Sequence, residues 1–248
     1  MKVGLFVTCL VDLMRPSIGF AALKLLEAAN YEVVVPKTQT CCGQPGWNSG
    51  DRKSARALAR KLIAEFEGCR YVVAPSGSCA GMIRTHFPEV FRDEPFMLAR
   101  AERLGERTYE LTEFLVKVAK RAIVPGSFDG AVTYHDSCSG LRELGVRTQP
   151  RRLLAGVQGL KLTEMKDSDV CCGFGGTFCV KYPDISNAIL AKKTDNIAAT
   201  RAGTLLAGDL GCLMNMAGKL QRLGTKVAAR HIAEVLAGMV DQPAIGER

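Results

Sequence analysis

The feature that most constrains this chain is a duplicated group of cysteines. Two adjacent cysteines followed by glycine occur twice, as Cys41-Cys42-Gly43 and as Cys171-Cys172-Gly173. Each copy has one cysteine upstream and one downstream, which are Cys9 and Cys79 for the first copy and Cys138 and Cys212 for the second. Equivalent cysteines lie 129 to 133 residues apart, and eight of the ten cysteines belong to the pattern. The duplication predicts a chain of two similar halves.

The length and the pattern of apolar residues agree with two halves. At 248 residues the chain can form two compact domains, which we place at residues 1–125 and 126–248. Pro125, Gly126 and Gly130 predict a linker over Ile123–Gly130. Short β-branched runs alternate with helical periodicity in both halves. We therefore expect an α/β fold of two pseudo-twofold-related domains, each a small parallel sheet flanked by helices.

The expected elements repeat in the same order. Strands are predicted at 3–8, 31–35, 71–74 and 108–111, and again at 131–135, 160–165, 204–207 and 226–231. Helices are predicted at 17–30, 51–67, 88–107 and 112–121, after Cys79, and again at 138–144, 185–201, 212–223 and 232–240. Ser17 and Asp51 are expected to cap their helices. The cysteine loops at 37–50 and 166–176 are too rich in turn residues to be regular.

The cysteines fall where a parallel sheet collects ligands. Cys9 and Cys79 follow the first and third predicted strands, and Cys41-Cys42 lie in the loop after the second. Open parallel sheets bind ligands beyond the carboxyl ends of their strands. Cys79 and Cys212 also lie near predicted helix N-termini, which favour thiolate. We expect two such clefts, one in each half.

The composition indicates the compartment and the redox state in which these cysteines are expected. The first residues lead directly into a strand, without the apolar stretch of a signal peptide, and no apolar run has membrane-spanning length. We expect a cytoplasmic protein with reduced thiols, and not a disulfide framework. The net charge of +8 is dispersed along helical segments, which indicates solvated helix faces or a surface that steers an acidic partner. No nucleic-acid recognition motif accompanies it.

Three roles for the patterned cysteines stay open from the residues alone. An iron–sulfur cluster suits adjacent cysteines, since each can bind a different iron. Structural zinc usually takes two ligand pairs at two- to four-residue spacing, which this chain lacks. A reactive thiol pair and buried structural cysteines are the alternatives. The glycines at 173, 175 and 176 lack the G-x-G-x-x-G spacing, so we expect no NAD or FAD on this chain.

The spacing resembles a known family. Cys9, Cys41-Cys42-Gly43 and Cys79, with their repeat from Cys138 to Cys212, resemble the paired CCG cysteine-rich domains of heterodisulfide reductase and of the glycolate oxidase iron–sulfur subunit. The length, and phrases such as Pro75-Ser76-Gly77-Ser78-Cys79, resemble the lactate utilization protein A family. This resemblance implies an iron–sulfur electron-transfer subunit that oxidises L-lactate to pyruvate only together with a ferredoxin-like iron–sulfur subunit and a third lactate-utilisation protein.

The resemblance also implies a ligand set. Relatives hold noncubane [4Fe–4S] clusters, so one or two clusters, of [4Fe–4S] type, are expected here. The family motif ends in a C-x-x-C pair, whose first position is Ser76 in one half and Asp209 in the other. The second site (Cys138, Cys171, Cys172, Cys212) is expected to hold its cluster more firmly, with Asp209 as a candidate fifth, oxygen ligand. The first site (Cys9, Cys41, Cys42, Cys79) is expected to be weaker.

Other residues are harder to assign, and most of them have more than one interpretation. His135 and Asp136 precede Cys138 and are either satisfied residues at a strand end or a catalytic proton relay. Cys69 is expected in the core, and Cys179 is either site-adjacent or unrelated. Trp47 either covers a cofactor, docks a partner or simply packs. The alternative function is a metal-free thiol–disulfide oxidoreductase that uses Cys171 and Cys172, and a third is a scaffold.

Overall fold

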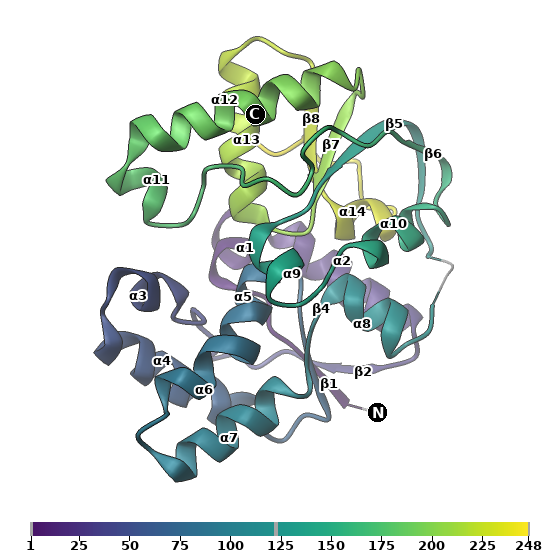
Figure 1. The fold of residues 1–248 in the computed structure, drawn as a ribbon. Helices are drawn as coiled ribbons and strands as arrows, with labels where there is room; N and C mark the ends of the chain where they lie inside the picture. The colour runs from purple at the N-terminus through teal and green to yellow at the C-terminus, as the bar shows by residue number, and fades with distance from the viewer. Residues whose placement is uncertain (1, 122–123, 248) are drawn as a thin grey trace.

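The computed structural model, which describes residues 2–121 and 124–247, contains two four-stranded parallel sheets (Figure 1). The first has the order β2-β1-β3-β4, with β1 Lys2–Leu5, β2 Glu32–Val34, β3 Tyr71–Ala74 and β4 Thr108–Glu110. The second has the order β6-β5-β7-β8, with β5 Ser127–His135, β6 Gln158–Leu162, β7 Thr204–Ala207 and β8 Ala228–His231. The expected α/β class with two similar parallel sheets is confirmed.

The strand register repeats between the sheets. Val3 pairs with Tyr71 in the first sheet, and Val132 pairs with Thr204 in the second. These pairs are related by the same offsets that relate the cysteines. The equivalence carries to the strand ends, so Phe6, whose N–H donates to the Val73 carbonyl, corresponds to His135.

Helices of the first half cover its sheet and reach the second half. They are α1 Cys9–Met14, α2 Pro16–Ala28, α3 Gln44–Ser49, α4 Arg52–Phe66, α5 Gly77–Gly81, the π-helix η1 Met82–His86, α6 Phe87–Val90, α7 Pro95–Gly105 and α8 Leu111–Lys117. Asp51 caps α4 as expected, because its side chain accepts the Ser54 N–H at 3.0 Å.

Two expectations for the first half are wrong. Ser17 does not cap α2, because Arg15 is the capping residue and Pro16 fills the first turn. The Ser17 hydroxyl instead donates to Glu234 at 2.7 Å. The loop at 37–50 contains α3, which Gly43 allows by adopting φ +86° at its N-terminal boundary.

The second half differs more from the expected elements. Its helices are α9 Cys138–Arg142, α10 Thr148–Leu154, α11 Phe178–Lys181, α12 Pro183–Ala199, α13 Leu210–Arg222 and α14 Ile232–Leu236. The short helices α10 and α11 were not predicted. Strand β6 begins before the expected residue 160, and β5 takes in residues 127–130 of the expected linker. Ile123, the first residue of that linker, lies outside the described residues.

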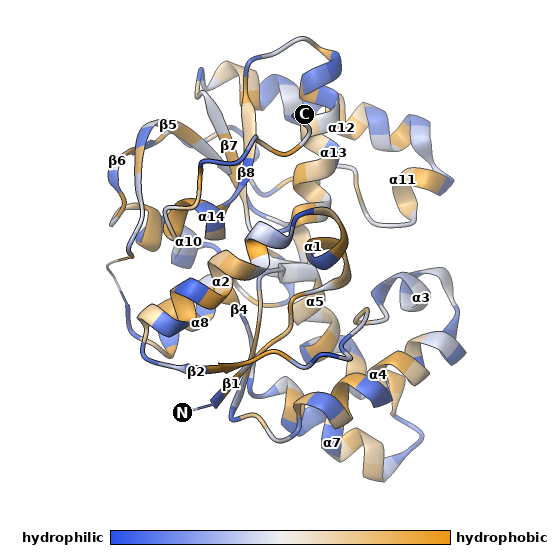
Figure 2. Ribbon diagram, turned by 180° about the vertical axis from the view of Figure 1, so that it is seen from behind, coloured by the Kyte–Doolittle hydropathy of each residue, from blue (hydrophilic) through white to orange (hydrophobic). Residues whose placement is uncertain are grey.

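The two halves share a core rather than touching at a thin boundary. One cluster of buried apolar side chains includes Ile18 and Leu25 of α2 together with Val235 and Leu236 of α14. Helix α2 lies at the junction of the halves and carries both hydrophobic and hydrophilic residues (Figures 1 and 2). An ion pair between Arg15 and the fully buried Glu234, at 2.8 Å, crosses the same junction. The relative position of the halves is therefore fixed by packing and by charge.

Among the helices of residues 2–121 and 124–247, none combines the length and apolar character needed to cross a membrane.

Candidate functional site

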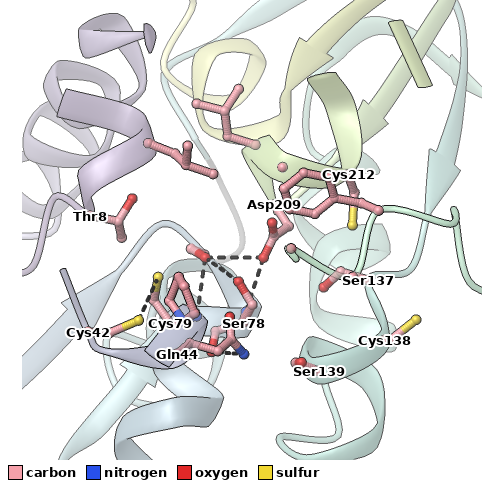
Figure 3. A pocket seen from close by; sticks show the side chains of 18 of the residues that line it. Thr8, Cys42, Gln44, Ser78, Cys79, Ser137, Cys138, Ser139, Asp209 and Cys212 are labelled. Atoms are coloured by element: carbon pink, nitrogen blue, oxygen red, sulfur yellow. Dashed lines mark hydrogen bonds between the residues drawn. The ribbon is translucent and has the colours of Figure 1, made fainter. Parts of the chain in front are cut away.

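All eight patterned cysteines line one cavity of about 310 Å³ between the halves. Figure 3 shows Cys42 and Cys79 on one side of it and Cys138 and Cys212 on the other. Other lining residues are Thr8, Gln44, Ser76, Ser78, Ser137, Phe174 and Asp209. The expectation of two separate clefts is wrong, since the carboxyl ends of both sheets open into a shared cavity.

Two glycines allow the halves to approach this closely. Helices α5 and α9, which each carry a cysteine, meet at Gly77 and Gly140. A Cβ atom on Gly77 would lie 2.8 Å from the Gly140 Cα atom, closer than side-chain carbons pack. Larger residues here would force the helices apart and separate Cys79 from Cys138. Gly77 and Gly140 therefore allow both cysteine groups to line the same cavity.

The Cys-Cys-Gly loops have the same geometry in both halves. Gly43 and Gly173 take φ of +86° and +83°, a left-handed conformation that glycine adopts without strain. Their N–H groups donate to the Sγ atoms of Cys41 and Cys171 at 3.4 and 3.3 Å. Hydrogen bonds of this kind stabilise thiolate sulfur. The glycine turns each loop so that its own N–H group reaches the sulfur of the first cysteine of the pair.

The first cysteine of each pair is the preferred thiolate. Hydrogen bonds from Cys42 and then Cys9 hold the pKa of Cys41 well below its usual range. Bonds from Cys138 and then Cys172 do the same for the pKa of Cys171. The donating thiols have correspondingly raised pKa values. Each half thus builds a compact, thiolate-centred group, which is what a thiophilic metal requires.

Sulfur separations within the groups are short without being covalent. The Sγ atoms of Cys42 and Cys79 lie 3.6 Å apart, and every cysteine of the described residues is a free thiol. A disulfide would require about 2.05 Å. Two sulfurs bound at about 2.3 Å to one tetrahedral ion lie about 3.8 Å apart. The first group is therefore arranged at a metal-binding separation.

In the second half a histidine joins the sulfurs. The ligand atoms of His135, Cys172 and Cys212 all lie within 4.8 Å of one another. His135 is fully buried, and neither ring nitrogen has a hydrogen-bond partner among the described residues. Burial, followed by the charge of Lys193, lowers the pKa of His135 to about 4. The ring is therefore neutral near pH 7 and has a lone pair to offer.

The expected proton relay of His135 and Asp136 does not form. The Asp136 carboxylate accepts two hydrogen bonds from Arg151, at 2.7 and 2.8 Å, and one from Ser168 at 3.0 Å. Neighbouring strand residues point to opposite faces, so the two side chains diverge. Asp136 is a structural anion in this fold.

Asp209 lies on the cavity wall but bonds to the other half. Its Oδ2 atom accepts hydrogen bonds from the Ser76 hydroxyl and the Ser78 N–H, both at 3.1 Å (Figure 3). Ser76 and Asp209 each lie three residues before the last patterned cysteine of their half, and here these equivalent residues contact each other. Asp209 was the candidate for a fifth ligand, binding through oxygen. One of its two carboxylate oxygens is thus used to join the halves.

Residues outside the cavity wall take structural roles. Cys69 is buried in the first-half core, as expected, and burial raises the pKa of its thiol. Cys179 does not line the cavity, but its thiol donates to the carbonyl of the lining residue Gly176 at 3.1 Å. Trp47 packs under the Arg52 guanidinium, 3.6 Å from the ring centroid. His231 caps α14, where its Nδ1 atom accepts the Ala233 N–H at 3.1 Å.

Sequence reasoning missed Lys193. This lysine is almost fully buried in α12, where its ammonium group donates to the Asp167 carbonyl. The Cys172 and Cys138 sulfurs lie close enough to affect its pKa, which burial lowers overall. Helices α4 and α12 bury the same five positions, and Leu62 is the equivalent residue of α4. A lysine at an apolar position of the repeat is the signal that would have identified it.

Comparison with known proteins identifies the family to which the chain belongs. The cysteine-rich domain family CCG matches twice, at residues 3–84 and 132–217. Proteins named lactate utilization protein A from Bacillus cytotoxicus and Geobacillus kaustophilus are each 46% identical over 95% of this chain and 98% of their own length. A hypothetical protein from Helicobacter pylori has the same fold, with a TM-score of 0.65 at 13% identity, over 97% of this chain and 49% of that one. The chain therefore belongs to the family of paired CCG cysteine-rich domain proteins that includes the lactate utilization proteins A.

Proposed function

We propose that this chain is an iron–sulfur electron-transfer subunit of an L-lactate-oxidising system. The observation that carries the proposal is the convergence of eight patterned cysteines on one cavity between the two sheets. Relatives that are 44 to 46% identical are named lactate utilization protein A, and they supply the link to lactate utilisation.

The residues fit an iron–sulfur cluster on several counts. Each half offers four thiols, which is the number that binds a [4Fe–4S] cluster. The cavity of about 310 Å³ has room for roughly ten water-sized groups. The Gly43 and Gly173 N–H groups already donate to cysteine sulfur, as is common around such clusters. One or two clusters would supply one-electron transfer, and the cysteines and glycine turns of this chain would hold and orient them.

We propose partners of two kinds for the oxidation itself. A ferredoxin-like iron–sulfur subunit and a third lactate-utilisation protein would receive electrons and bind the hydroxy acid, in the cytoplasm. The chain itself carries no G-x-G-x-x-G dinucleotide motif. The basic surface implied by a net charge of +8 suits an acidic redox partner.

The proposal is tested by replacing one site cysteine and one core cysteine. We expect Cys172→Ser to lose cluster iron from the anaerobically prepared protein and to abolish growth on lactate in a strain that depends on this chain. Cys69→Ser, which removes a buried thiol outside the cavity, should keep both. A Cys172→Ser protein with full iron content and normal lactate growth would refute the proposed role.

A metal-free thiol–disulfide oxidoreductase is the second candidate, and the stabilised Cys171 thiolate favours it. Such an enzyme requires a low-pKa thiol that reacts rapidly and has no dependence on iron. Rapid alkylation of Cys171 in protein that stays iron-free after reconstitution would support this alternative. Protection of Cys171 from alkylation by reconstitution with iron and sulfide would exclude it.

A further inference from the structure

The two cysteine groups stand on a repeated scaffold, yet the second group has a polar neighbour behind its cysteines that the first group lacks. The strand register makes Phe6 of the first half equivalent to His135 of the second. Phe6 is packed among apolar side chains and makes an edge contact with Phe66. At the equivalent place His135 has one ring nitrogen within 4.8 Å of the Cys172 and Cys212 sulfurs. The difference is one of chemistry at the same position of the repeated fold.

Core packing does not explain this histidine. Both ring nitrogens are buried and lack hydrogen-bond partners in the described part of the chain, which is an unfavourable arrangement for polar atoms. The Ser168 carbonyl, which accepts the Asp136 N–H at 3.0 Å, lies near enough to raise the pKa of His135, but it does not reach hydrogen-bond geometry with either ring nitrogen. An apolar residue would fill the same place without that cost, as Phe6 does. The ring instead lies with its ligand atom within 4.8 Å of the Cys172 and Cys212 sulfurs.

We propose that His135 is a nitrogen ligand of the metal bound at the second site. The first site then has sulfur ligands alone, whereas the second has Cys138, Cys171, Cys172, Cys212 and an imidazole. The inference rests on the proposed function for the identity of the metal as cluster iron. The donor geometry itself is independent of that identity, since neutral imidazole and thiolate together bind zinc as well as iron.

The second cysteine group has two further donors close to it. One carboxylate oxygen of Asp209 is already held by Ser76 and Ser78 of the other half. His135 approaches Cys172 and Cys212 from the end of β5, and its ring nitrogens have no hydrogen-bond partner in the described part of the chain. The imidazole is therefore the fifth donor that is available to a metal.

The two sites also differ in nearby charge. The second site keeps the same four thiolates as the first and adds a neutral imidazole, so the ligand charge is equal at the two sites. The buried ammonium of Lys193 has the apolar Leu62 as its equivalent in α4. A positive charge close to the cysteines stabilises the reduced, more negative form of a bound cluster, so the second site is the better electron acceptor of the two.

The test is pulsed EPR on the full chain, reconstituted with iron and sulfide without oxygen, reduced, and labelled with nitrogen-15 histidine. We expect a nitrogen-15 coupling to the reduced cluster. It should disappear in His135→Phe, which installs the residue of the first half, and persist in His86→Gln, whose partly exposed histidine lies beside Glu89 and Glu143. We also expect His135→Phe to release iron to a chelator at least about tenfold faster.

A second readout serves for the oxidised state and for folding. Iron-57 Mössbauer spectra should contain a minor doublet from the nitrogen-bound iron, which His135→Cys removes while keeping the iron. Thermal unfolding of His135→Phe and His135→Gln shows whether each variant folds. If the unmodified chain binds its full complement of iron but shows neither the nitrogen coupling nor the minor doublet, the role of His135 is overturned and the proposed function stands. Protein without iron after reconstitution would overturn both.

Discussion

The two halves of this chain have the same strand order, register and cysteine loops, but they surround their cysteines with different side chains. The first half buries Phe6 and Leu62 where the second buries His135 and Lys193. One scaffold therefore presents an all-sulfur group beside apolar walls and a second group beside an imidazole and an ammonium. A duplicated fold can thus differentiate its two halves by replacing residues behind the cysteines while the Cys-Cys-Gly turns keep the same backbone conformation.

The halves also differ in how their last helices are anchored. Glu113 at the start of α8 and Glu234 at the start of α14 occupy equivalent positions after β4 and β8. Glu113 pairs with Arg84 of its own half, whereas Glu234 pairs with Arg15 across the junction. The second anchor thus contributes to holding the halves together, and the first does not.

The largest effect is expected from breaking the anchor at the junction. Glu234→Ala leaves the Arg15 side chain, which is only 13% exposed, without its carboxylate. Loss of one member of a buried pair costs about 3–5 kcal/mol in the free energy of unfolding. Glu113→Ala is the matched control and should cost less, because Arg84 is 31% exposed and can be hydrated. Equal losses in denaturant unfolding of the two variants would contradict the distinction.

The capping residues of the same two helices predict opposite responses to pH. Burial raises the pKa of Glu110 to about 7. The folded state therefore holds a proton that the unfolded state releases between about pH 4.5 and 7. The contribution of Glu110 to the free energy of unfolding must therefore fall as the pH rises through this window. Burial lowers the pKa of the equivalent cap, His231, so its contribution rises with pH.

Glu110→Gln measures this difference. Relative to the unmodified chain, the variant should gain up to about 3 kcal/mol in the free energy of unfolding between pH 4.5 and 7.5. His231→Gln should change the pH dependence in the opposite sense. Denaturant unfolding of the metal-free proteins at several pH values checks both signs. A Glu110→Gln curve parallel to that of the unmodified chain would show that Glu110 does not take up a proton on folding.

A smaller effect is expected from the glycines of the cysteine loops. An alanine Cβ at Gly173 would lie 2.5 Å from the Ser186 carbonyl oxygen, whereas at Gly43 it would lie 3.3 Å from the Ala55 carbonyl oxygen. Both glycines have positive φ, so both substitutions carry a backbone cost of about 1–2 kcal/mol. The closer contact should make Gly173→Ala worse than Gly43→Ala by about 2 kcal/mol. Thermal unfolding of the metal-free variants measures this, and a larger loss for Gly43→Ala would reverse the comparison.

Much of the fold was accessible from the sequence because its signals are local. Apolar β-branched runs and the Asp51 cap depend on nearby residues, and both halves repeat them. The short helices α3 and α11 were hidden by turn residues, since glycine and proline occur both in loops and at helix ends.

The site was only partly predictable, for a physical reason. Strand order places cysteines at the carboxyl end of each sheet, but nothing in either half indicates that the two ends face one cavity. That arrangement depends on the contact of Gly77 with Gly140 and on the Arg15–Glu234 pair, which join residues far apart in the chain. His135 was ambiguous for the same reason, because its neighbours Cys172 and Cys212 come from other elements.

We propose that the shared cavity holds iron–sulfur clusters on the two cysteine groups. The iron and acid-labile sulfide content of the chain after reconstitution without oxygen tests this proposal. We expect equal amounts of iron and sulfide, about four of each per occupied site, with the second site retained in Cys42→Ser and lost in Cys172→Ser. Protein that remains free of iron and sulfide, or that binds them equally well without Cys42 and Cys172, would contradict it.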